Sequence, residues 1–198
     1  MGQRLPPSLR VLAVEDGPFT SPQGERAARA PLLGVVTRGA QIHKLLTAWI
    51  EVDGVDATER IVELAHPVRR GLSALLLHGL PYAGFNIVDA PLLTRELGLP
   101  VLAVLSAKPR REAVETALRR HFPDWQQRLQ VLEAAGPPMP LELSPGCVAY
   151  FQAVGVDRGS AEALIRSLTV FGKIPEPLRV ARLLADAFSP WALDEAGR

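Results

Sequence analysis

The sequence contains a single cysteine, Cys147, among its 198 residues. One thiol excludes an internal disulfide and is typical of proteins in a reducing compartment. Long apolar runs are also missing, because stretches such as Ala74–Leu77 and Val101–Leu105 fall far short of the roughly 18 residues of a membrane span. We therefore expect a cytoplasmic protein that has no membrane partner.

Net charge is nearly absent, since 22 Lys and Arg residues against 21 Asp and Glu residues leave a formal charge of +1. Overall charge therefore does not attract nucleic acid, and a local basic groove would be needed. Apolar residues make up 47% and charged residues 22%, which is typical of a globular chain. The length favours one domain over residues 1–198, with a core that needs no disulfide or metal support.

Three apolar stretches near the N-terminus predict strands, at residues 9–14, 32–37 and 42–52. The link at residues 38–41 is short enough for a hairpin. The polar segment 19–30 predicts a mobile loop.

The rest of the chain alternates helix and strand signals. Asp56 and Glu59 have the spacing of a capping box, which predicts a helix that starts at Asp56. Strands are expected at Ala74–Leu77 and Val101–Leu105, on either side of a glycine-containing loop and a helix. Further helices are expected at residues 111–122, 124–135, 160–170 and 176–188, a strand at 147–154, and a proline-rich linker at 137–140. This order predicts an α/β protein with a mixed sheet, in which three antiparallel strands precede alternating helices and parallel strands flanked by helices.

Carboxylates follow two of the predicted strands. Glu15 and Asp16 end the first strand, and Asp53 and Asp56 follow the third. A hard divalent cation such as Mg²⁺ or Mn²⁺ takes oxygen ligands from separate chain segments, so these four residues are the candidate metal ligands. Two structural alternatives remain: Asp56 only caps a helix, and Asp16 only shapes the Gly-Pro turn that follows it.

His78 ends the fourth predicted strand and leads into a loop with two glycines and two aromatic rings. The loop lacks the Lys-Ser/Thr pair of a nucleoside-triphosphate site, but its rings offer stacking faces and its glycines allow close approach of a base. The alternative is that both rings pack into the core. The candidate substrate-binding residues of this loop are Pro81, Tyr82, Gly84, Phe85 and Asn86.

Three charged residues elsewhere are candidates for contacts with substrate. Lys108 follows the fifth strand, where it would neutralise a phosphate. Glu176 and Arg179 flank a Pro-x-Pro turn and would either close the site or cap the last helix.

Five segments in order carry a family resemblance: 15–19 (EDGPF), 52–61 (VDGVDATERI), 83–86 (AGFN), 122–125 (FPDW) and 174–179 (IPEPLR). Together they resemble the endonuclease dU family, which is related to endonuclease V. The resemblance implies a ribonuclease H-like fold and metal-dependent cleavage of phosphodiester bonds near deaminated bases, such as uracil. It also implies a nucleic-acid partner, DNA rather than RNA, and a catalytic group of Glu15, Asp16, Asp53 and His78.

Two residues depart from the family pattern. Relatives carry aspartate where this chain has Glu15, and an aspartate before glycine where it has His78. Magnesium prefers oxygen ligands to imidazole. A catalytically impaired module that binds nucleic acid or nucleotides on the same scaffold is therefore the alternative function, and a role in protein interaction is a third.

Overall fold

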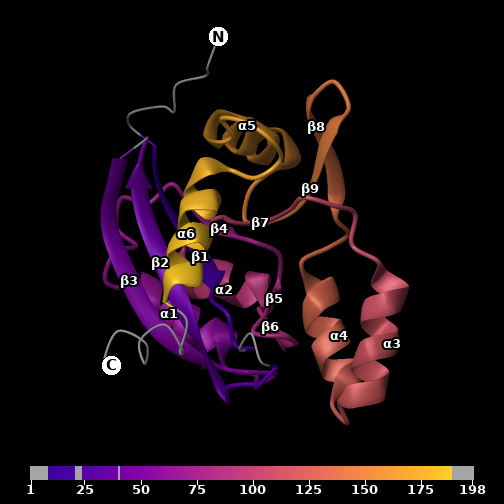
Figure 1. Cartoon of the computed structure of the whole chain (residues 1–198). Helices are drawn as coiled ribbons and strands as arrows, with labels where there is room; N and C mark the ends of the chain where they lie inside the picture. The colour runs from indigo at the N-terminus through magenta and orange to yellow at the C-terminus, as the bar shows by residue number, and fades with distance from the viewer. Residues whose placement is uncertain (1–8, 21–23, 40, 189–198) are drawn as a thin grey trace.

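The computed structural model describes residues 9–20, 24–39 and 41–188. Its main feature is a seven-stranded sheet of order β3-β2-β1-β4-β7-β9-β8 (Figure 1). The strands are β1 (Arg10–Asp16), β2 (Arg29–Arg38), β3 (Gln41–Glu51), β4 (Ala74–Leu77), β7 (Val101–Leu105), β8 (Met139–Ser144) and β9 (Cys147–Val154).

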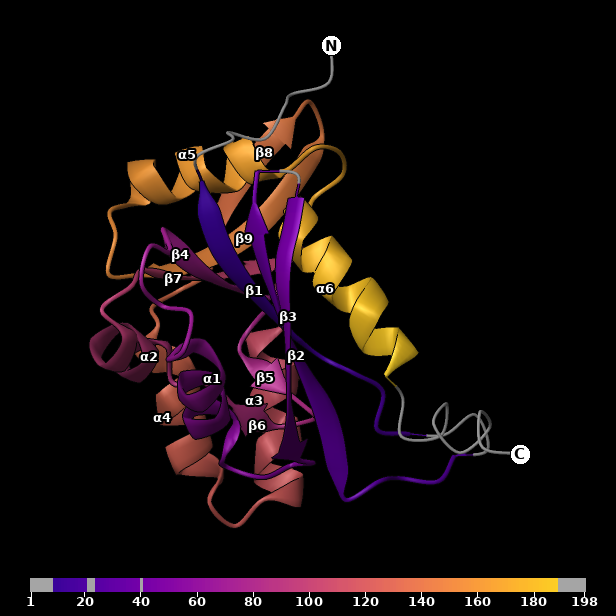
Figure 2. The same ribbon diagram turned by 90° about the vertical axis from the view of Figure 1, so that its left-hand side faces the viewer.

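Helices cover both faces of this sheet (Figures 1 and 2). The side chains of β1 alternate between two apolar layers: Leu12 and Val14 pack in one, Val11 and Ala13 in the other. The first layer lies under α1 (Ala57–Ala65) and α2 (Ala90–Leu97), and the second under α5 (Arg158–Leu168) and α6 (Glu176–Ala187). Helices α3 (Arg111–His121) and α4 (Trp125–Ala134) form a hairpin beside the sheet.

The strand directions follow from the connections. β1 and β2 are joined by the loop over residues 17–28, and β2 and β3 by the link at 39–40. Both pairs are antiparallel, whereas β1–β4 and β4–β7 are parallel. Helices α1 and α2 are the crossovers that parallel strands require. The predicted mixed α/β sheet flanked by helices is confirmed. In the described part of the chain, no helix is both long and apolar enough to cross a bilayer.

Three local predictions were wrong. The expected linker at 137–140 continues into β8, where Pro140 is tolerated because β8 is an edge strand that pairs only with β9. The expected loop after β4 contains a small hairpin of β5 (Pro81–Tyr82) and β6 (Asn86–Ile87). Helix α5 begins at Arg158, two residues early, because the Asp157 side chain accepts a hydrogen bond from the backbone N–H of Ser160 at 3.0 Å.

The predicted loop at 19–30 is shorter than expected. Thr20 and Arg26 pair as an isolated bridge, and β2 begins at Arg29. Residues 21–23 of this loop lie outside the described part of the chain.

Candidate functional site

The site is built around the carboxyl end of β1, at the centre of the sheet. Successive side chains of a strand point to opposite faces, so Glu15 and Asp16 separate although they are adjacent in sequence. Their contacts agree: Glu15 bonds to Arg182 of α6, and Asp16 to the backbone of Ala83 in the loop between β5 and β6. The site therefore has two halves, one on each face.

The Glu15 half is a buried carboxylate between two cationic groups. Glu15 is 2% exposed, and its Oε1 accepts a hydrogen bond from Arg182 Nη1 at 2.9 Å. His78 Nδ1 lies 3.2 Å from the same oxygen. This contact raises the pKa of His78, against the opposing effect of its burial. Glu15 Oε2 is buried and has no hydrogen-bond partner among the described residues.

The Asp16 half joins β1 to the turn after β3. Asp16 Oδ2 accepts a hydrogen bond from the backbone N–H of Ala83 at 2.8 Å, and the carbonyl of Ala83 accepts one from Asp53 at 2.8 Å. The backbone N–H and C=O of one residue, Ala83, thus link two carboxylate residues that are far apart in sequence. Burial raises the pKa of Asp16 to about 6, and the neighbouring Glu15 charge acts in the same direction.

Asp53 is held in a left-handed backbone conformation with φ of 58°. Its Oδ1 accepts a hydrogen bond from the backbone N–H of Phe85 at 2.9 Å, and its Oδ2 lies 2.7 Å from Arg26 Nη2. Gly84 is required beside it, because φ there is +90° and a Cβ atom would lie 2.2 Å from Asp53 Oδ1.

Asp56 and Asn86 form a structural junction at the start of α1. The predicted capping box is absent, since Asp56 makes no side-chain cap and its Oδ1 instead accepts hydrogen bonds from Asn86 Nδ2 at 2.7 Å and the Glu51 N–H at 3.1 Å. Asn86 Oδ1 accepts from the Ala57 N–H at 2.9 Å and so replaces the cap from a distant strand. Each residue has a positioning task here, and their predicted roles as ligand and substrate contact stay predictions.

The aromatic residues of the loop after β4 differ in accessibility. Tyr82 is 1% exposed and its hydroxyl donates to the Val14 carbonyl at 2.7 Å, so its ring belongs to the core. Burial raises the pKa of Tyr82 well above its usual value. Phe85 is half-buried and meets Phe122 edge to face at a centroid distance of 5.5 Å, while Pro81 is exposed.

Two arginines at the site escaped the sequence analysis. Arg128 of α4 donates from Nη1 to the carbonyls of Gly54 at 2.8 Å and Phe85 at 2.7 Å, and it pairs with Asp124. It therefore clamps the turn after β3 against the loop between β5 and β6. Arg182 lies one turn beyond Arg179 on α6, outside the segments that carried the resemblance. The Arg182 side chain is 53% exposed, so no pattern of buried residues along α6 could have indicated its role.

Other predicted residues are not in contact with these carboxylates in the described residues. Lys108 is exposed between β7 and α3 and has no ion-pair partner there. Glu176 and Arg179 pair with each other at 2.8 Å at the start of α6, and the Arg179 guanidinium lies over the Phe171 ring at 5.5 Å.

The chemistry of Glu15 and Asp16 fits a divalent cation. Both carry oxygen ligand atoms. Glu15 has a buried oxygen that makes no hydrogen bond within the described residues, although it lies 3.2 Å from His78 Nδ1, and burial disfavours the charge of Asp16, which a bound cation would offset. A third ligand does not lie close enough to join them, because within the described ranges no three His, Cys, Asp or Glu side chains are grouped so that they could hold one metal ion. The alternation of β1 is the reason, together with the pairing of Asp53 with Arg26.

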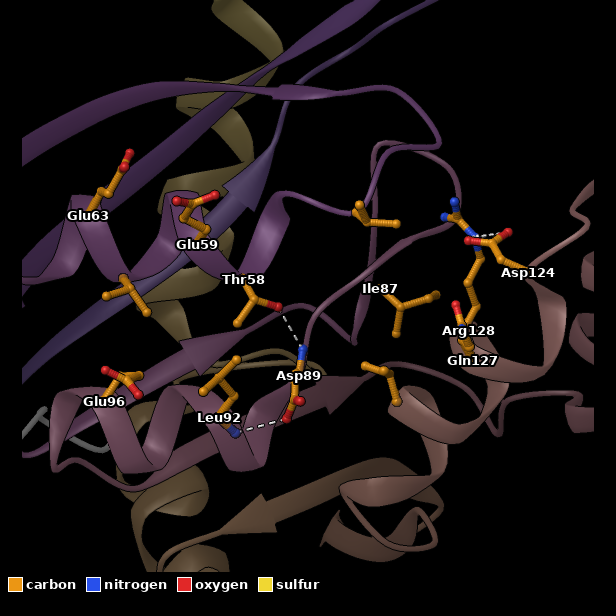
Figure 3. Close-up of a pocket in the computed structure, with 13 residues that line it drawn as sticks. Thr58, Glu59, Glu63, Ile87, Asp89, Leu92, Glu96, Asp124, Gln127 and Arg128 are labelled. Carbon is orange, nitrogen blue, oxygen red and sulfur yellow. Dashed lines mark hydrogen bonds and ion pairs between the residues drawn. The ribbon is translucent and has the colours of Figure 1, made fainter.

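A separate cavity of about 780 Å³ lies between α1, α2 and α4 (Figure 3). Its lining includes the carboxylates Glu59, Glu63 and Glu96 around apolar residues such as Ile87 and Leu92. A surface of this charge repels phosphate, so the cavity does not match the predicted nucleic-acid site.

Comparison with known proteins places the chain. Residues 7–189 match the family model described as endonuclease dU. The chain belongs to the endonuclease dU family. Among the curated members, a UPF0215 protein of Thermococcus gammatolerans is 43% identical over 189 residues, covering 94% of this chain and 95% of that protein.

Solved structures agree with the fold of this endonuclease dU family member. A protein of unknown function from Archaeoglobus fulgidus has a TM-score of 0.80 and 28% identity, covering 92% of this chain and 99% of that one. The endonuclease V of Ciona intestinalis, in complex with a 24mer DNA containing an inosine followed by a ribo-adenosine, has a TM-score of 0.54 and 13% identity, covering 96% and 86%. The predicted family and the endonuclease V-like fold are confirmed.

Proposed function

We propose that the protein is a divalent-metal-dependent endonuclease that cleaves phosphodiester bonds near deaminated bases in DNA. The observation that carries the proposal is a contact between Glu15 and His78 at the carboxyl ends of β1 and β4, with Asp16 next in sequence to Glu15 and linked through Ala83 to Asp53. Ligand sites in open α/β sheets lie at such strand ends. Membership of the endonuclease dU family supports the same reaction class, and the inosine-containing DNA bound by a protein of similar fold supports the substrate class.

In this proposal Glu15 and Asp16 hold Mg²⁺ or Mn²⁺, with Asp53 as a further ligand once Arg26 releases it. When bound, the cation would stabilise the negative charge that develops at the reacting phosphate. Arg182 orients Glu15 through their 2.9 Å contact. His78 carries the proton for the leaving oxygen, because its contact with Glu15 favours the charged imidazolium.

The loop between β5 and β6 is the proposed base-binding element. Pro81 and Phe85 offer the accessible apolar surface, and Gly84 lets a base approach the backbone. Tyr82 and Asn86 fix the two ends of this loop to the sheet through hydrogen bonds to the carbonyls of Val14 and Glu51. Lys108 would contact a backbone phosphate, and the ion pair of Glu176 and Arg179 would border the substrate.

A nicking assay tests the proposal on strands that contain uracil or hypoxanthine, with Mg²⁺ and Mn²⁺ compared. We expect cleavage by the parent chain and by Glu96→Gln, a matched control in the separate cavity. We expect at least a hundredfold loss in Asp16→Asn. No cleavage by the parent in either metal, or equal cleavage by Asp16→Asn, would refute the nuclease assignment.

A second candidate is a catalytically impaired module that binds nucleic acid. It is favoured by the Glu15 half of the site, where the side chains of Arg182 and His78 already balance the carboxylate charge. This candidate predicts salt-sensitive binding without turnover, and cleavage gained only in His78→Asp. Binding that does not weaken as salt rises would exclude it.

A further inference from the structure

The outer edge of β3 is a surface that the proposed reaction does not use. β3 is the first strand of the sheet order, so within residues 9–20, 24–39 and 41–188 its outward backbone N–H and C=O groups have no neighbouring strand (Figure 1). The strand runs for 11 residues from Gln41 to Glu51 and contains no proline. Long edges of this kind are templates for pairing with another chain.

The side chains of β3 make this edge apolar as well as open. Leu46, Ala48 and Ile50 turn toward the layer under α1, whereas Leu45, Thr47, Trp49 and Glu51 are exposed on the other face. Leu45 is 38% exposed and Trp49 is 39% exposed. Helix α6 packs on β1 and β2 (Figure 2), and the described part of the chain leaves this face of β3 partly exposed.

We propose that β3 pairs antiparallel with β3 of a second copy of this chain, around a two-fold axis at Thr47. A two-fold axis perpendicular to the sheet keeps each face on its own side, and it must lie midway between the two strands, at the point where one residue faces its own copy. An axis at Thr47 sets Leu45 of each copy opposite Trp49 of the other. An axis at Leu46 would set Leu45 opposite Thr47, and an axis at Leu45 would set Trp49 opposite Gln41.

Only the Thr47 register among these three matches apolar side chains with each other. It forms two pairs of Leu45 with Trp49, and aromatic–aliphatic pairs across strands are stabilising. The polar ends of the strand match too, because this register sets Glu51 of each copy opposite His43 of the other, and an imidazole N–H can donate a hydrogen bond to a carboxylate.

The mass of the full chain in solution tests the pairing. We expect a species of twice 21.4 kDa. The double variant Leu45→Lys, Thr47→Lys places lysines against each other across the seam and should weaken dimerisation at least about tenfold. Thr47→Val, which keeps strand preference, is the matched control and should retain the dimer. Matching circular dichroism spectra show that each variant folds.

Register is tested by cross-linking in a Cys147→Ser background, since Cys147 is the only natural thiol. In the Thr47→Cys variant, the new cysteine of one copy lies opposite the same cysteine of the second copy and should form an intermolecular disulfide on mild oxidation. Gln41→Cys, at the strand end, should not. A monomeric parent, a dimer that persists in the double-lysine variant, or equal cross-linking at residues 41 and 47 would each overturn the proposal. None of these readouts depends on nuclease activity.

Discussion

The perturbation with the clearest expected signature is Asp16→Asn, which removes a charge and keeps the shape of the site. The asparagine oxygen can still accept the hydrogen bond from the backbone of Ala83, which measures 2.8 Å in the parent. The change therefore isolates the cost of ionising a carboxyl that is buried beside Glu15.

The size and sign of the effect follow from the pKa of Asp16, which is raised from 3.8 to about 6 in the folded chain. Between these values the folded state holds a proton that the unfolded state has released, so the stability of the parent falls as pH rises through this window. One pKa unit corresponds to about 1.4 kcal/mol, so the loss is on the order of 3 kcal/mol. Asp16→Asn lacks this loss. It should be as stable as the parent below the window and more stable by that amount above it.

Urea denaturation from acid to mildly alkaline pH, with a chelator present, measures the difference. The exposed carboxylate variant Glu96→Gln is the control and should follow the parent at every pH. Adding Mn²⁺ above the window should stabilise the parent and leave Asp16→Asn unchanged, because a bound cation offsets the charge of Asp16. A stability difference that is constant with pH would refute the argument from burial. A parent that Mn²⁺ does not stabilise would count against the proposed cation site.

Three further substitutions test the supports of the site by urea denaturation. Gly84→Ala should lower the free energy of unfolding by at least about 2 kcal/mol, because φ is +90° and a Cβ atom would lie 2.2 Å from a carboxylate oxygen. Gly98→Ala is the control, since it is also at positive φ but has open space around it, and it should lower this free energy by less. Equal losses in the two variants would contradict the steric explanation. Arg182→Met should lower the free energy of unfolding by about 2 kcal/mol at neutral pH, since it leaves Glu15 buried with one cationic partner. Adding Glu15→Gln should restore most of this loss. No recovery in the double variant would show that the loss comes from packing and not from charge. Asn86→Ala should cost about 3 kcal/mol by orphaning buried groups at the start of α1, and a loss under about 1 kcal/mol would show that water replaces them.

The elements that could be predicted from sequence are those whose signal is local. The buried strands β1, β4 and β7 are apolar throughout because both sheet faces are covered by helices. The sequence also marks both ends of helix α2, where Asp89 is the N-cap and Gly98 is a C-cap in the left-handed conformation. The resemblance to the endonuclease dU family likewise rests on short ordered segments, and the family match bears it out.

Predictions failed where two local signals competed or where the partner was distant. The prolines near residue 140 suggested a linker, but alternating burial and pairing with β9 make this segment an edge strand. Asp56 carried a capping signal, yet its carboxylate is drawn to Asn86, which lies 30 residues later. No pattern within the first helix could have indicated a cap supplied by another strand.

The amino-acid order alone determined that two carboxylates end the first strand and that a histidine ends the fourth, because strand ends are marked by the residues that terminate an apolar run. Tertiary packing decided what each group meets. The two-residue period of β1 turns Glu15 toward Arg182 and Asp16 toward Ala83, and only the arrangement of α6 and the loop between β5 and β6 supplies those partners. Local sequence encodes which face a side chain takes, but the opposite charge or hydrogen-bond donor comes from segments 67 to 167 residues away.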